Sequence, residues 1–147
     1  MSGGRPDDGG CLFCRIVAGE EPASVVHAEA RMIAFLDAFP VNPGHVLLVP
    51  RRHAVGLADL DPADGVALWR VAHRLAPLLR AEPWGEGVNL HLSDGAAAHQ
   101  EVMHVHLHVI PRRRGDGLRI VQDNPASRPR RAELDEVAGR LRGALGA

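Results

Sequence analysis

Apolar and polar residues alternate along the stretch that runs from position 103 to a proline at position 111. Three histidines alternate with three apolar residues in the order His104, Val105, His106, Leu107, His108 and Val109. Successive side chains of a β-strand point to opposite faces of a sheet. The pattern therefore predicts a strand whose apolar residues face the core and whose histidines line the other face. Pro111 is expected to end this strand, because proline cannot donate a backbone hydrogen bond.

Four other segments are predicted to be strands: residues 24–28, 31–38, 45–49 and 88–92. The third of them is almost entirely apolar, which is typical of a central strand, and Pro50 is expected to stop it. In the fourth, Leu90 alternates with Asn89 and His91, so we expect one polar face there.

A helix is predicted to begin at Asp61, because aspartate caps helices and Pro62 suits the first helical position. It should run to about residue 80, with Pro77 kinking or shortening it. Its predicted apolar stripe consists of Val66, Trp69, Leu75, Leu78 and Leu79. A C-terminal helix is expected from about residue 130, where apolar residues recur at helical spacing: Leu134, Val137, Ala138, Leu141 and Leu145. These elements predict an α+β fold with a mostly antiparallel sheet of about five strands.

Length and composition fit one soluble domain, with 147 residues of which 46% are apolar. Residues 1–10 are predicted to be a disordered tail, and residues 11–147 a single domain with a helical extension from about residue 128. The sequence offers no apolar signal core and no run long enough to cross a bilayer, and it has only two cysteines. We therefore expect a cytoplasmic protein with no membrane partner.

Charge argues against a nucleic-acid partner, since the formal net charge is −1. Aromatic residues make up only 3% of the chain, which leaves little surface for stacking bases. All 17 basic residues are arginines, whose planar side chains can bind a phosphate in a bidentate manner.

The histidine row is the candidate reactive centre. A neutral imidazole is a good nucleophile toward phosphorus, and the usual histidine pKa of about 6.5 leaves His106 mostly neutral at neutral pH. The outer two histidines would be roughly 13 Å apart on a strand, so one ion cannot easily take all three. The preceding loop offers Gly95 and Gln100 as donors to phosphate oxygens. This combination indicates phosphoryl or nucleotidyl transfer through a covalent histidine.

Residues 104–110 resemble the signature of the histidine triad superfamily, in which three histidines alternate with apolar residues. The resemblance covers roughly residues 11–116, including the Phe35-Leu36-Asp37 and Pro43-Gly44-His45 segments. It implies a nucleotide-binding hydrolase or transferase, usually a homodimer, that cleaves dinucleoside polyphosphates or nucleoside phosphoramidates at the α-phosphate.

The resemblance also implies roles for individual residues. His106 would be the nucleophile, His108 and Gln100 would contact the phosphate, and Asp37 would accept hydrogen bonds from the ribose. Phe13, Ile16 and Phe35 would line the base pocket, although these residues could equally be core packing, and Asp37 could be a turn residue. Ser93 stands where asparagine is common, which weakens a sugar or phosphate contact there.

Two further departures from the family pattern lie beside the expected phosphate site. His99 replaces a glycine, so that a side chain crowds the backbone. Glu101 replaces a small hydroxyl residue, and a carboxylate near a phosphate opposes binding by like-charge repulsion. Lower activity or an altered leaving-group preference follows as an expectation, and Glu101→Ser is expected to raise phosphoramidate turnover.

Cys11 and Cys14 form a C-x-x-C pair, which on its own fits a redox pair or two apolar side chains. A closed zinc site needs two more ligands. The resemblance to bacterial family members implies that His53 and His104 complete it as a structural zinc site. His106 and His108 would then remain for the phosphate.

Other interpretations stay open. The chain could be a non-catalytic nucleotide sensor, or a zinc-activated hydrolase that uses the histidine row as metal ligands. Arg112–Arg114 fit a solvated turn or a contact with the distal part of a polyphosphate. His45 is expected to pack or to bind backbone, and surface or core positions are expected for His27, His73 and His91.

Overall fold

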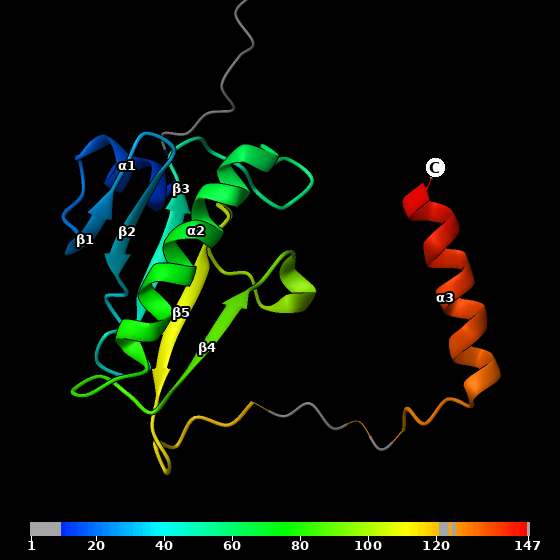
Figure 1. Cartoon of the computed structure of the whole chain (residues 1–147). Helices are drawn as coiled ribbons and strands as arrows, with labels where there is room; N and C mark the ends of the chain where they lie inside the picture. Colours follow the sequence, from blue (N-terminus) through cyan, green and yellow to red (C-terminus); the bar gives the residue numbers. More distant parts are fainter. Residues whose placement is uncertain (1–9, 121–123, 125, 147) are drawn as a thin grey trace, which may run out of the picture.

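A five-stranded antiparallel sheet forms the body of the computed structural model, which describes residues 10–120, 124 and 126–146. The strands lie in the order β1-β2-β3-β5-β4 and have these bounds: β1 Val25–Ala28, β2 Met32–Leu36, β3 Val46–Pro50, β4 Gly87–Leu92 and β5 Leu107–Arg112. The α-helices are α1 Leu12–Ala18, α2 Pro62–Leu79 and α3 Arg131–Gly146, and a short 3-10 helix, η2, spans Ala96–Ala98. The predicted α+β class is confirmed (Figure 1). The predicted disordered tail lies outside the described residues except for Gly10.

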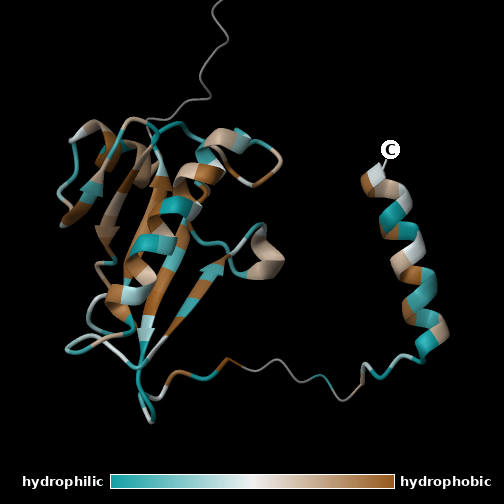
Figure 2. Ribbon diagram, in the orientation of Figure 1, coloured by the Kyte–Doolittle hydropathy of each residue, from teal (hydrophilic) through white to brown (hydrophobic). Residues whose placement is uncertain are grey.

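The two faces of the sheet are buried by different helices, as the period of two requires. On one face α2 covers a core to which Met32, Leu48 and Val109 contribute from three adjacent strands. On the other face Phe35 and Leu47 pack with residues of α1. The central strands are coloured largely as hydrophobic (Figure 2). Helix α1 covers only part of its face, so the neighbouring stretch of β5 and β4 stays open there.

Helix α2 begins as predicted, with the Asp61 side chain accepting a hydrogen bond of 2.8 Å from the Ala63 backbone N–H. The predicted stripe was partly wrong, because Val66, Trp69 and Leu78 are 64%, 61% and 64% exposed. The buried face consists of Ala67, Leu68, Val71, Ala72 and Leu79. Leu68 and Val71, two apolar residues that the predicted stripe left out, therefore face the sheet together with Leu79. Pro77 lies in the last turn and does not shorten the helix.

Strand β3 ends at Pro50 as predicted, whereas β5 continues one residue past Pro111 to Arg112. The ladder between β3 and β5 covers only Val46–Leu48 and Leu107–Val109. Each proline therefore has a strand neighbour on one side only, β2 in the first case and β4 in the second. A missing N–H is tolerated at such a position because the open side needs no donor.

Strand β5 begins at Leu107 and not at position 103, which corrects the predicted boundary. The Val105 N–H donates a 2.7 Å hydrogen bond to the Ala54 carbonyl, which belongs to a loop and not to a neighbouring strand. Alternation nevertheless continues through this segment, because Val105 is buried in the core on the α2 side while His106 lies on the other face.

The C-terminal helix α3 confirms the helical spacing predicted for the tail. None of its described residues is buried, and Figure 1 draws it apart from the sheet. Among the described residues, no helix has both the length and the apolar character needed to cross a membrane.

Candidate active site and metal centre

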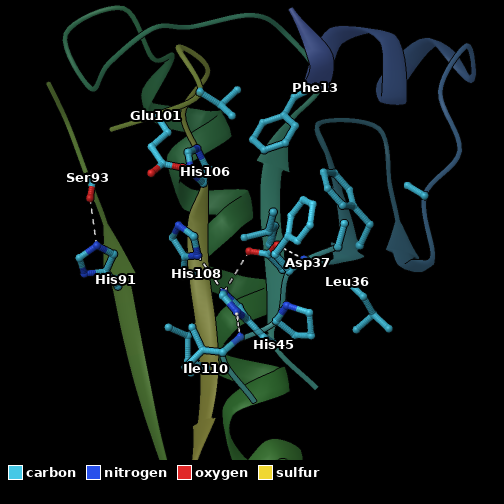
Figure 3. Close-up of a pocket in the computed structure, with 18 of the residues that line it drawn as sticks. Phe13, Leu36, Asp37, His45, His91, Ser93, Glu101, His106, His108 and Ile110 are labelled. Carbon is cyan, nitrogen blue, oxygen red and sulfur yellow. Dashed lines mark hydrogen bonds and ion pairs between the residues drawn. The ribbon is translucent and has the colours of Figure 1, made fainter. Parts of the chain in front are cut away.

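A pocket of about 1030 Å³ opens on the sheet face opposite α2. Its floor carries His106 and His108, and its apolar wall includes Phe13 and Phe35 (Figure 3). Phe13 comes from α1, whereas Phe35 and the histidines come from the sheet region. The pocket thus joins an apolar wall to a row of imidazoles.

The His106 ring is held in one orientation and one tautomer. Its Nδ1 lies 2.7 Å from the His104 carbonyl oxygen. A carbonyl can only accept, so Nδ1 must carry the proton and Nε2 keeps a free lone pair. The Phe13 ring meets the imidazole edge-on, with centroids 5.1 Å apart and planes at 82°. His106 is 8% exposed and lines the pocket, so it is packed but not sealed off.

A chain of hydrogen bonds fixes the tautomers of two further histidines. The Val41 backbone N–H donates to His45 Nδ1 at 3.1 Å, so the His45 proton must lie on Nε2. That Nε2–H donates to His108 Nδ1 at 2.8 Å. His108 in turn must carry its own proton on Nε2, the nitrogen left free to donate to a bound ligand.

Burial keeps these two rings neutral. Desolvation, together with the neighbouring histidines, lowers the pKa of His108 to about 4, while the Asp37 carboxylate opposes this shift. Desolvation also lowers the pKa of His45, although an Asp37 oxygen lies 3.6 Å from His45 Nε2. Neutral rings are what the hydrogen-bond chain requires.

The free energy of unfolding is expected to fall as the pH drops from 6.5 toward about 4, because His108 resists protonation in the folded state over that range. The unfolded chain takes up the proton near the ordinary pKa, so protonation favours unfolding until the folded state also binds it. Denaturant titrations of wild type and His108→Asn at about pH 5.5 and about pH 7.5 test this. Wild type should lose more stability than the variant between the two pH values, and equal losses would contradict the assignment.

A second cluster lies behind the pocket wall, where Cys11, Cys14, His53 and His104 bring their ligand atoms within 4.8 Å of one another. The measured separations are 3.4 Å from Cys11 Sγ to His104 Nδ1, 3.3 Å from Cys14 Sγ to His53 Nδ1, and 3.2 Å between the two Nδ1 atoms. Tetrahedral zinc with ordinary bond lengths separates its ligand atoms by about 3.3–3.8 Å. The four residues therefore fit a closed zinc site.

The orientation of His104 supports the same conclusion. Its Nε2 lies 2.8 Å from the Pro50 carbonyl oxygen, so Nε2 carries the proton and Nδ1 presents its lone pair to the cluster. The two cysteines are not joined to each other by a disulfide.

A third set of residues, Asp37, His45 and His108, also gathers possible ligand atoms within 4.8 Å. A cation on His45 Nε2 would move the ring proton to Nδ1, where it would face the Val41 N–H instead of accepting from it. The tautomers therefore favour a hydrogen-bond chain here. The zinc-activated hydrolase interpretation concerns His104, His106 and His108, and these three do not gather into one group of possible ligand atoms among the described residues.

Known proteins with a similar sequence indicate which family has this fold and these two sites. The model of the HIT domain family matches residues 18–115. This chain belongs to the HIT family.

Relatives of this HIT protein are similar over most of its length. An uncharacterized HIT-like protein of Mycobacterium tuberculosis strain H37Rv is 39% identical over 112 residues, which are 76% of this chain and 78% of the relative. The crystal structure of a zinc-bound histidine triad family protein from Mycobacterium smegmatis has a TM-score of 0.72 and 35% identity, with 93% and 99% of the two chains covered. A histidine triad nucleotide-binding protein from Candida albicans has a TM-score of 0.80 and 31% identity, with 92% and 97% covered.

The pocket of this HIT protein collects nearly all residues that the sequence singled out for substrate contact: Phe13, Ile16, Phe35, Asp37, Ser93, His106 and His108. Phe13 and Phe35 are also packed edge-on against each other, with ring centroids 5.5 Å apart, so core packing and pocket lining coincide. Asp37 also serves as a turn residue, since one of its oxygens accepts a 2.9 Å hydrogen bond from the Phe39 N–H.

Gln100 is the exception among the predicted contact residues. Its side chain is buried and is not part of the pocket lining. The amide accepts from the Gly95 N–H at 2.8 Å and donates to the carbonyls of Val55 and Val102 at 2.6 and 3.1 Å. The predicted phosphate contact is replaced in this structure by an anchoring role, because these backbone groups already use the amide.

Sequence reasoning gave two of the pocket histidines, His45 and His91, no role in substrate binding or catalysis. His45 does bind backbone as expected, but it also orients His108. His91 lies opposite His108 in the β4–β5 register, with ring centroids 5.6 Å apart, and shares a 2.9 Å hydrogen bond with Ser93. The polar face predicted for residues 88–92 was the only sign in the sequence that His91 could face a site. The β4–β5 register is what places His91 beside His108.

Arg112, the last residue of β5, and the two arginines after it are not part of the pocket lining, although Arg112 donates to the lining residue Asn89 at 2.6 Å. Arg112 donates to both oxygens of Asp116 at 2.7 and 2.9 Å, which lowers the pKa of that carboxyl group. Arg113 donates to both oxygens of Glu82 at 3.0 and 2.9 Å. None of Arg112, Arg113 and Arg114 lines the pocket, so the structure favours a structural turn over a polyphosphate contact.

Proposed function

We propose that this HIT protein is a nucleotide-binding hydrolase or nucleotidyl transferase that acts at the α-phosphate through a covalent nucleotidyl-His106. One observation carries the proposal. In the neutral ring, the hydrogen bond from His106 Nδ1 to the His104 carbonyl leaves the Nε2 lone pair free in a pocket with an apolar wall. A neutral imidazole in that state is a nucleophile toward phosphorus.

The proposed reaction has two balanced steps. The Nε2 lone pair of His106 forms a bond to the α-phosphorus while the bond to the leaving group breaks, and the leaving group takes that electron pair and a proton from solvent. A water or another acceptor then attacks the phosphorus, loses a proton, and releases His106 with its lone pair. The Nε2–H of His108 donates to a phosphoryl oxygen in both steps, which stabilises the charge that develops there.

Substrate binding follows from the rest of the lining. The apolar wall of Phe13, Ile16 and Phe35 suits a nucleobase, and the Asp37 carboxylate suits ribose hydroxyls. Ser93 is hydrogen-bonded to His91. It lies across the histidine row from Phe13 and Asp37 (Figure 3). Gln100 supports the loop beside the phosphate through its three backbone contacts.

We also propose a structural zinc held by Cys11, Cys14, His53 and His104, on the ligand geometry described above. Zinc in such a closed site supplies cross-linking and no reactive coordination position. It would join α1 to the segment before β5. Phe13 lies between the two cysteines and packs on His106, so this cluster and the nucleophile share one packing unit.

The function is tested by incubating the purified chain with adenosine and guanosine phosphoramidates and with dinucleoside polyphosphates. Release of a nucleoside monophosphate from at least one class is expected. Tight nucleotide binding without any release would support the sensor interpretation instead. A panel of this kind also identifies the preferred base.

His45→Phe is expected to lower kcat by about tenfold or more, because His108 would lose the donor that fixes its tautomer. His45→Gln is the matched variant, since its amide can accept from Val41 and donate to His108 as the imidazole does. It should recover most of the rate. Equal losses in both variants, with unchanged thermal stability, would contradict the proposed role of the hydrogen-bond chain.

We propose a homodimer as well. The apolar side chains of Val66 and Trp69 on α2 are 64% and 61% exposed, and β4 is an edge strand. Exposed apolar surface beside an unpaired strand edge favours association. A cytoplasmic location and the absence of nucleic-acid and membrane partners stay predictions.

A further inference from the structure

The pocket lining has an unusual charge inventory for a site that handles phosphates. The chain contains 17 basic residues, all arginine, yet none of the described residues that line the pocket is an arginine. The lining instead carries two carboxylates, Asp37 and Glu101. Permanent cations are the usual means of binding several phosphate charges. A substrate with one phosphate charge therefore fits this pocket better than a polyphosphate.

The nearest arginines in sequence to the histidine row are already engaged. Arg112 and Arg113 each hold a carboxylate with two hydrogen bonds, as described above. Moving either one into the pocket would break both of its hydrogen bonds to Asp116 or Glu82. These ion pairs keep positive charge out of the site.

Glu101 is the carboxylate that nothing in the described part of the chain neutralises. Its side chain is exposed and makes no hydrogen bond or ion pair with another described residue. Its position is nevertheless fixed, because the neighbouring Gln100 is anchored to three backbone groups and Val102 packs against the core under α1. Glu101 thus presents an unpaired negative charge at the pocket rim.

Glu101 and Asp37 lie at different parts of the pocket (Figure 3). Asp37 lies on the β2 side of the pocket, while Glu101 is drawn beside His106. Phe13 and Phe35 are 5% and 3% exposed, so the wall proposed for the base is the inner part. Exposed lining residues lie at both ends of the pocket, Phe39 beyond Asp37 and Glu101 beside His106. With the sugar at Asp37 and the reacting phosphorus at His106, the leaving group is placed at the Glu101 end.

We propose that Glu101 determines leaving-group specificity and selects nucleoside phosphoramidates whose amine carries a second, positively charged group. This inference rests on the proposed function. The carboxylate attracts an ammonium on the leaving group and repels the phosphates of a dinucleoside polyphosphate. Two unit charges about 4 Å apart in a water-like medium interact strongly enough for roughly a fivefold effect on kcat/KM. The effect should weaken as salt concentration rises.

The test compares two adenosine 5′-phosphoramidates of similar size, one formed with butylamine and one formed through a single nitrogen of 1,4-diaminobutane. Wild type should show a kcat/KM roughly fivefold higher for the diamine compound. Glu101→Gln should bring the ratio close to one by raising the rate with butylamine relative to the diamine. Glu101→Arg should raise kcat/KM for diadenosine tetraphosphate relative to kcat/KM for the two phosphoramidates. Glu20→Gln removes an exposed carboxylate outside the pocket and should keep the wild-type ratio.

The outcomes separate the two levels of the proposal. Turnover with the same ratio in wild type and Glu101→Gln would overturn the role of Glu101 while the proposed function stands. No adenosine monophosphate from any of the three compounds would overturn the proposed function and this inference with it.

Discussion

Replacing His106 with asparagine should lower nucleotide turnover by about a thousandfold or more, because asparagine has no lone pair that attacks phosphorus. The variant should still fold, since its amide N–H can donate to the His104 carbonyl as the imidazole Nδ1–H does. It should also still bind nucleotide, because the apolar wall and Asp37 are unchanged. Steady-state kinetics and equilibrium binding measure the two properties separately.

His73→Asn is the matched control for this variant. His73 is exposed on α2, outside the pocket and outside the cysteine-histidine cluster. Its replacement should leave turnover within the error of wild type. If His106→Asn kept more than a few per cent of the wild-type kcat, a covalent histidine at this position would be the wrong mechanism.

Cys14→Ser should remove the proposed zinc and lower the free energy of unfolding by at least about 3 kcal/mol. Cys14 Sγ lies near both histidines of the cluster, 3.3 Å from His53 Nδ1 and 3.5 Å from His104 Nδ1, so its loss should affect the whole site. Metal analysis of protein purified without chelator should give one zinc per wild-type chain and none per variant chain. Thermal unfolding gives the change in stability.

Chelator provides the control for this second prediction. Wild type treated with chelator should unfold at the temperature of Cys14→Ser, and the variant should not respond to chelator. A wild-type chain without metal, or a variant as stable as wild type, would contradict a structural zinc. Nucleotide binding should weaken in parallel, because Phe13 lies between the two cysteines and packs on His106.

The period-two pattern was enough to predict which side of the sheet the site occupies. Val105 and Val109 are in the core, and His106 and His108 are in the pocket, as the alternation required. The start of β5 was not predictable in the same way. An alternating segment has the same sequence pattern whether or not it pairs with a neighbouring strand. Val105 donates to the Ala54 carbonyl of a loop, and the sequence pattern does not reveal such a tertiary contact.

Roles that depend on contacts between distant segments were the ones that the sequence left open. His45 and His108 are 63 positions apart, and only the β3–β5 register brings them into hydrogen-bond contact. The predicted contact residue Gln100 turns inward because Val55, from another loop, supplies a carbonyl that it binds. The α2 stripe was partly misplaced because apolar residues occur on two faces of the helix, and only packing against the sheet buries Leu68 and Val71 while Val66 and Trp69 stay exposed.

The most direct test of the central claim is mass spectrometry of the chain quenched during turnover of an adenosine phosphoramidate. We expect a fraction of the protein to carry one adenosine monophosphate group, attached to His106 in the peptide map and absent from His106→Asn. Turnover without any such adduct, or an adduct on another residue, would contradict the mechanism proposed for this HIT protein.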